Sequence, residues 1–128
     1  MRRAVLDTNV LVSAILSLKG NAAVILGMIT EGSLTPVYCC QILGEYTGVL
    51  ARPRFGFPKN LVDEVLSLFE VFGVPVDPQK SDFPMLDESD RIFYDTAAAG
   101  AATLITGNLR HYPEKPFVVS PADFLLQL

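Results

Sequence analysis

The sequence has no tryptophan, one histidine and two cysteines, and no apolar run approaches the ~20 residues that a membrane span requires. The two cysteines, Cys39 and Cys40, are adjacent, so a disulfide between them would be strained. Without other cysteines or clustered histidines they cannot form a zinc site, and we expect both to be reduced and structural.

After Met1-Arg2-Arg3, only three apolar residues precede Asp7, which is too few for a secretory signal. We therefore expect a cytoplasmic protein that does not bind a membrane.

Positive charge is also scarce. The 10 Lys and Arg residues are outnumbered by 14 Asp and Glu residues, which gives a net charge of −4 and a pI near 4.8. This argues against a protein that holds nucleic acid chiefly through many phosphate contacts. It does not exclude a nuclease, because carboxylates that hold cations lower the pI, and bound divalent ions restore attraction for phosphate.

Short apolar runs alternate with helical patterns along the 128 residues, whose number fits a single domain, residues 1–128. The expected strands are residues 4–6, 35–38, 74–76, 103–105 and 117–119. The expected helices are residues 10–18, 22–29, 41–50, 60–72, 89–99 and 121–126. This alternation predicts an α/β fold, a three-layer α/β/α sandwich around a mainly parallel sheet of about five strands.

Residues typical of helix ends predict where three of the helices begin or end. Asn60 is expected to cap the helix 60–72, and Gly100 is expected as the residue that ends the helix 89–99. Ser120 as N-cap, Pro121 in the first helical position and Asp123 three positions after Ser120 indicate the start of the last helix.

Acids stand where a site in such a sheet is built, at the carboxyl ends of its strands. Asp7 follows the first expected strand; Glu45 borders the buried arc of its helix; Asp90 opens the helix 89–99 and borders its buried face. Asn108 ends the turn Thr106-Gly107-Asn108 and would present its amide oxygen at the same edge.

Each of these signals also has a simple structural explanation. Glu45 fits a solvated helix acid paired with Arg52, and Asp90 fits an acid favoured by the helix dipole. Gly-Asn is a frequent choice for a plain turn. Asp95 is placed to pair with Arg91 at i,i+4, so we expect it to be structural or to support the site from behind.

Taken together and in this order, four segments resemble the PIN-domain family, in particular the toxin components of bacterial and archaeal toxin–antitoxin pairs. The segments are LDTNVLVSAIL at 6–16, ILGEYTGVLARPRF at 42–55, DESDRIFYDTAAAGAATLITGN at 87–108 and VVSPADFL at 118–125. The resemblance implies a metal-dependent ribonuclease whose acids gather at the carboxyl edge of a parallel sheet. Asp7, Glu45 and Asp90 correspond to the family's first three acids. Asn108 stands where many members have a fourth acid, which leaves open whether one or two ions bind.

The expected ion is Mg²⁺ or Mn²⁺, since both prefer oxygen ligands and clustered carboxylates repel one another without a cation. Asp7 and Asp90 are expected as principal ligands, with Glu45 and Asn108 helping directly or through water. The groups expected behind these ligands are Thr8, Asn9, Thr106 and Asp95.

Basic side chains suggest where RNA binds. Arg52, Arg54 and Lys59 surround a loop after the Glu45 helix, and Phe55 or Phe57 is available there for base stacking. Arg110 and His111 follow the Asn108 turn and are further candidates for phosphate contacts. Solvated loop charges and a surface histidine are equally ordinary readings of these residues.

Other functions fit less well. A haloacid-dehalogenase-type enzyme needs a second acid where Asn9 stands, and a receiver domain needs an acidic pair and a late lysine that are not evident. A non-catalytic PIN-like module that binds RNA or protein remains the main alternative to a nuclease. The resemblance also implies an antitoxin protein that covers the cleft, and a homodimer.

Overall fold

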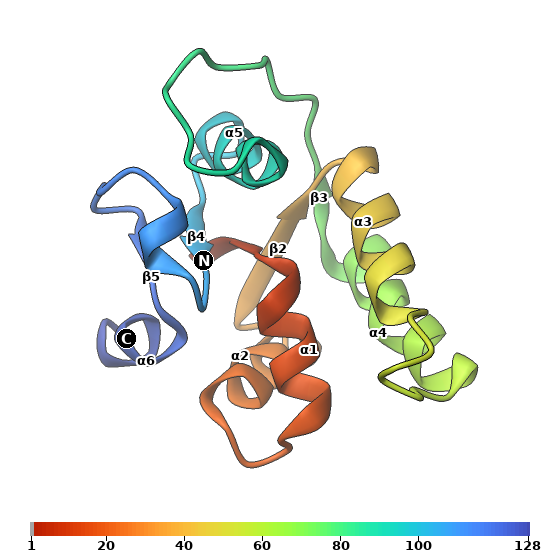
Figure 1. Ribbon diagram of the computed structural model, residues 1–128. Helices are drawn as coiled ribbons and strands as arrows, with labels where there is room; N and C mark the ends of the chain where they lie inside the picture. The colour runs from red at the N-terminus through yellow and green to blue at the C-terminus, as the bar shows by residue number, and fades with distance from the viewer. Residues whose placement is uncertain (1) are drawn as a thin grey trace.

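The computed structural model describes residues 2–128, in which five parallel strands form one sheet in the order β3-β2-β1-β4-β5 (Figure 1). The strands are β1 Arg2–Leu6, β2 Leu34–Tyr38, β3 Val74–Pro75, β4 Thr103–Ile105 and β5 Val118–Val119. The α-helices are α1 Thr8–Leu16, α2 Asn21–Thr30, α3 Cys40–Leu50, α4 Lys59–Phe72, α5 Arg91–Ala99 and α6 Pro121–Leu126. Two short 3₁₀ helices, η1 Glu88–Asp90 and η2 Leu109–His111, complete the element list. The predicted α/β fold is confirmed.

Helices cover both faces of the sheet. α5 packs against β1, β2 and β4 on one face, while α1, α2 and α6 lie on the other (Figure 1). α3 and α4 pack against each other beside β2 and β3. Because β1 is covered on both sides, Ala4, Val5 and Leu6 are all buried, which explains its unbroken apolar run.

Helix ends agree with the sequence in some places and differ in others. Ser120 caps α6 as predicted, accepting a hydrogen bond from the Asp123 N–H at 3.1 Å. Asn60 does not cap α4: the helix begins at Lys59, and Pro58 is the capping residue, its carbonyl accepting from the Val62 N–H. Proline suits this boundary because its fixed φ lets it precede a helix and it has no N–H to leave unpaired.

Gly100 ends α5 as predicted, without the left-handed conformation for which glycine is often used at helix ends. Its φ is −90°, and the next residue, Ala101, has the positive φ of 50°. Glycine fits here for a steric reason, since a Cβ at position 100 would lie 2.6 Å from Cγ1 of Val37 on β2. The close packing of α5 on the sheet depends on this missing side chain.

No single helix in residues 2–128 is long and apolar enough to cross a membrane. The consecutive helices α1 and α2 pass that test as a pair on length and composition alone, with a bend of 100° between them.

The order of the strands creates a switch point. From β1 the chain moves outward through β2 and β3, then returns past β1 to place β4 on its other side. Sheets of this type bind ligands beside the strand ends at the switch point, and we call the region next to the carboxyl ends of β1 and β4 the crevice. Asp7 and Thr106 are the residues that directly follow β1 and β4.

Candidate active site

Asp7 lies at the centre of this crevice. Its backbone N–H donates to the carbonyl of Ile105 at 3.0 Å, so the ends of β1 and β4 are tied together. Its side chain is buried, and one carboxylate oxygen, Oδ2, accepts two hydrogen bonds: from Thr106 Oγ1 at 2.8 Å and from the Tyr112 hydroxyl at 2.9 Å. The position and orientation of this carboxylate are therefore fixed by groups from the other side of the switch point.

A second set of bonds holds the two turns in register. The Asn9 side-chain oxygen accepts from the Gly107 N–H at 3.0 Å, and the Asn108 N–H donates to Thr106 Oγ1 at 3.0 Å. Asn108 thus lies at the predicted edge and shapes the turn through its backbone, while the residue is largely exposed to solvent. Asn9 and Thr106, which were expected behind the ligands, thus bond the two turns to each other and Thr106 bonds to Asp7.

Glu45 reaches the same crevice from α3. Its Oε2 accepts from Thr8 Oγ1 at 2.8 Å, directly beside Asp7. The neighbouring Tyr46, fully buried, donates its hydroxyl proton to the Leu6 carbonyl and so anchors α3 to β1. Burial raises the pKa of Tyr46 well above its usual value, and the charges of Asp7 and Glu45 add to this effect.

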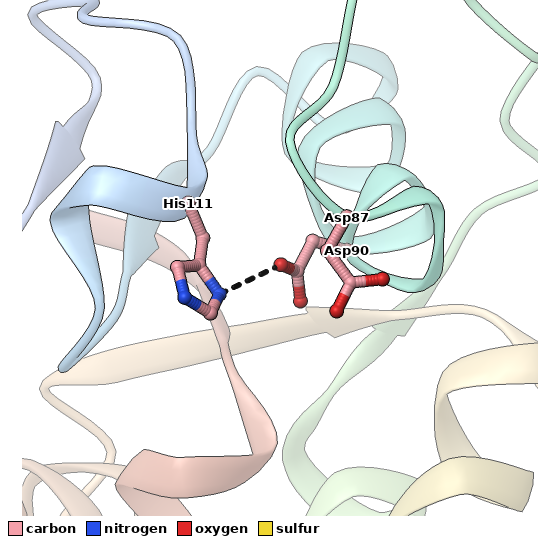
Figure 2. A group of neighbouring side chains, drawn as sticks. All are labelled: Asp87, Asp90 and His111. Atoms are coloured by element: carbon pink, nitrogen blue, oxygen red, sulfur yellow. Dashed lines mark hydrogen bonds and ion pairs between the residues drawn. The ribbon is translucent and has the colours of Figure 1, made fainter.

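Asp90 enters from the start of α5. Figure 2 shows its carboxylate facing His111 of η2, with Asp87 beside it; Asp90 Oδ2 lies 3.2 Å from His111 Nδ1. Burial raises the pKa of Asp90 from 3.8 to about 6, and the negative charges of Asp7 and Asp87 contribute to the rise. The hydrogen bond and charge of His111 act in the opposite direction. Asp90 and Asp7 are therefore electrostatically coupled across the crevice.

A family profile described as PIN domain matches residues 3–110. The chain belongs to the PIN-domain family. No curated protein shows a significant match to the chain. The PIN domain is in general a metal-dependent nuclease fold. In this PIN domain Asp7 directly follows β1, Glu45 lies on α3 and Asp90 directly precedes α5.

The donor groups of this PIN domain fit a divalent cation. One ligand atom each from Asp87, Asp90 and His111 lie within 4.8 Å of one another, and this is the one such group of three found in residues 2–128. Asp7 and Glu45 are not members of this group; besides Asp90 it contains Asp87, which was not predicted as a ligand, and His111. A bound cation would relieve the like-charge repulsion that raises the pKa of Asp90.

The partner of Asp95 differs from the predicted one. Among the described residues it forms no ion pair with Arg91; its Oδ2 instead accepts from the Ser81 N–H at 3.0 Å. Arg91 turns away toward Glu88, at 2.6 Å, and toward the carbonyls of Ser81 and Phe83. The two side chains hold the loop before η1 together, because that loop offers backbone partners that one helix cannot supply.

The basic residues divide into two groups. Lys59 pairs with Asp63 at 2.9 Å, and the Arg54 guanidinium lies over the Phe55 ring, 4.8 Å from its centroid. Phe55 stacks in turn on Phe57, so neither ring is as free for a base as the sequence suggested. This loop, which also carries the exposed Arg52, starts roughly 10 Å further along α3 than Glu45. Arg110 and His111 form the second group: both lie in η2, and His111 contacts Asp90.

Sequence reasoning missed Asp87 and Tyr112. Asp87 has a local signal, because Asp-x-Ser favours a turn in which the carboxylate accepts from the Ser N–H, as Asp87 does from Ser89 at 3.0 Å. That turn positions Asp90. Tyr112 has no such signal, since its partner Asp7 is 105 residues away in the chain.

Proposed function

We propose that this PIN domain is a divalent-metal-dependent ribonuclease that hydrolyses phosphodiester bonds of RNA, and that it serves as the toxin of a toxin–antitoxin pair. One observation carries the nuclease proposal. Acids from three elements, Asp7 after β1, Glu45 on α3 and Asp90 at the start of α5, converge on the switch point of a parallel sheet, and the charge of Asp7 reaches far enough to raise the pKa of Asp90.

Asp7 and Asp90 are the proposed principal ligands of Mg²⁺ or Mn²⁺. Glu45, held by Thr8, and Asn108 assist directly or through water. When bound, such an ion supplies positive charge for the phosphoryl oxygens and lowers the pKa of a coordinated water. Asp87 and His111 add two further donors beside Asp90, which supports cation binding at this end of the crevice even though Asn108 is neutral.

Substrate and partners follow from the charge of the crevice. Arg110 and His111 border the acids and are placed to contact RNA phosphates, while Arg54 presents its guanidinium from the stack on Phe55. We propose a cytoplasmic homodimer whose antitoxin covers the crevice and inserts a basic side chain among the acids. An inserted cation would compete with the divalent ion for the same carboxylates, which is a simple means of inhibition.

The test is Asp7→Asn. The amide keeps an oxygen for Thr106 and Tyr112 but removes the charge, so we expect the fold to persist and Mn²⁺-dependent cleavage of a mixed-sequence single-stranded RNA to fall at least about 100-fold. Asp63→Asn, at an exposed ion pair on α4, serves as the control and should cleave like wild type.

The exposed, neutral Asn108 favours one rival, a non-catalytic RNA-binding module. Wild-type protein that binds the RNA in Mn²⁺ without cutting it would replace the nuclease proposal with this one. Cleavage by Asp7→Asn at the wild-type rate would show that the crevice is not the active centre.

A further inference from the structure

Tyr112 lies just beyond the residues that the PIN profile matches, at the end of η2. Its side chain is buried, and its hydroxyl donates to Asp7 Oδ2 at 2.9 Å. No property of the local sequence calls for a tyrosine here, and the interaction joins the first strand to a segment far along the chain. The hydroxyl therefore has a specific partner in the proposed active site.

Both donors to Asp7 reach the same oxygen. Thr106 Oγ1 and the Tyr112 hydroxyl bind Oδ2, and no hydrogen bond to Oδ1 is found in the described part of the chain. A carboxylate held on one oxygen by two donors cannot rotate freely about its last torsion. The direction of the second oxygen, Oδ1, is therefore fixed, and Oδ1 is available to another partner.

We propose that Tyr112 is a positioning residue, which together with Thr106 holds Oδ2 of Asp7 so that Oδ1 is the oxygen offered to the divalent ion. This inference rests on the proposed function, because it assumes that Asp7 binds that ion. Groups that hydrogen-bond to metal ligands fix their orientation and commonly affect metal affinity.

A phenol suits this task better than a basic side chain. A buried carboxylate needs hydrogen-bond partners, but a lysine or arginine partner would cancel the charge that attracts the ion. A tyrosine hydroxyl ordinarily loses its proton only at about pH 10, so at neutral pH it is an uncharged donor to Asp7. Asp7 is satisfied and stays available to a cation.

The same short segment also contacts the other principal acid. His111, the residue before Tyr112, lies 3.2 Å from Asp90. η2 thus places consecutive side chains on Asp90 and Asp7, and the identity of residue 112 decides only the contact with Asp7.

The experiment compares Tyr112→Phe with wild type by calorimetric Mn²⁺ titration and by RNA cleavage at several Mn²⁺ concentrations. We expect Mn²⁺ to bind at least about tenfold more weakly, kcat to fall at limiting Mn²⁺ with little change in KM for RNA, and excess Mn²⁺ to restore cleavage. Asp7→Asn should not be restored. Tyr94→Phe is the control, because Tyr94 is equally buried but packs between Phe83 and Phe117, away from Asp7.

Thr106 gives an independent readout of the same oxygen. Thr106→Val should weaken Mn²⁺ binding and Thr106→Ser should retain it, and this pair decides the matter if Tyr112→Phe does not fold. Wild-type Mn²⁺ affinity in Tyr112→Phe, or in Thr106→Val where it is the deciding variant, would overturn the inference while the nuclease proposal stands. Wild-type protein that binds no Mn²⁺ would overturn both.

Discussion

At the scale of single residues, Asp90 is a carboxyl group that the fold makes harder to ionise. Burial, then the charges of Asp7 and Asp87, raise its pKa from 3.8 to about 6. In the unfolded chain the group loses its proton near its ordinary pKa, so between these two values the folded state binds the proton more tightly. Ionisation of Asp90 therefore lowers the stability of the metal-free protein, progressively from about pH 4 to pH 6 and fully above that.

Asp90→Asn should consequently stabilise the metal-free protein at pH 8 and have little effect at pH 4. A shift of about two pKa units sets an upper limit near 3 kcal/mol, and solvent screening of this partly buried group reduces the expected gain in unfolding free energy to about 1–2 kcal/mol. Urea denaturation in EDTA at both pH values measures it, with the exposed Asp63→Asn as control. A loss of stability at pH 8 would contradict this electrostatic account.

The residues of the site were predictable to different degrees. Asp7, Glu45 and Asp90 could be named as candidates because a strand end and the border of a helix face can be read from local patterns, and the family resemblance joined them into one proposed site. Tyr112 was not predictable, since no residue near it in the chain indicates that its partner is Asp7, directly after β1. Residue-scale prediction fails where the contact depends on how two distant segments meet.

At the scale of elements, Arg91 controls the loop that leads to the acids. Its side chain is 10% exposed, and its guanidinium binds Glu88 and the carbonyls of Ser81 and Phe83. Asp95, one turn along α5, accepts from the Ser81 N–H. The irregular stretch between β3 and η1 is thus held by α5. Because Asp87 and Asp90 follow this stretch directly, its position determines where the two acids lie.

Arg91→Gln should loosen this loop without unfolding the sheet. The carbonyls of Ser81 and Phe83 lose a charged donor, so we expect cleavage by a nonspecific protease within residues 77–87 to accelerate at least about tenfold, and Mn²⁺ binding to weaken. Mass spectrometry of the first fragments locates the cut. Lys59→Gln, which breaks the exposed ion pair on α4, should leave the rate unchanged.

The elements themselves were largely predictable because strands buried on both faces and helices with one apolar face have distinct periods. The pairing of Arg91 with Asp95 was wrong for a physical reason. Spacing along one helix describes only the partners on that helix, whereas a long side chain near a loop finds backbone carbonyls that no periodicity reveals. Among the helix ends, the cap predicted at Asn60 was wrong, because Pro58 takes that place at the start of α4. Gly100 ends α5 as predicted, and the close packing of this residue on Val37 is a further reason for glycine that the sequence does not reveal.

At the scale of the whole molecule, the strand order β3-β2-β1-β4-β5 brings the acids together. Asp7, Glu45 and Asp90 are far apart in the chain, and they meet because the fold places β1 between β2 and β4. Burial of apolar side chains on both faces of the sheet opposes the repulsion among these acids. That repulsion is the reason a divalent cation should favour the folded molecule over the unfolded chain, in which the acids are dispersed.

Mn²⁺ should therefore raise the melting temperature of the wild-type protein. At a free concentration 100 times its Kd, an ion that binds only the folded state contributes about 2.7 kcal/mol, which for a chain of this size corresponds to a rise on the order of 10 °C. Scanning calorimetry in EDTA and then in Mn²⁺ measures the shift, and Asp7→Asn should show little of it. The measurement needs no RNA. An equal rise in the melting temperature of both proteins would mean that the ion binds elsewhere. A rise confined to the wild type would link the stability of the whole fold to metal binding at the acidic crevice.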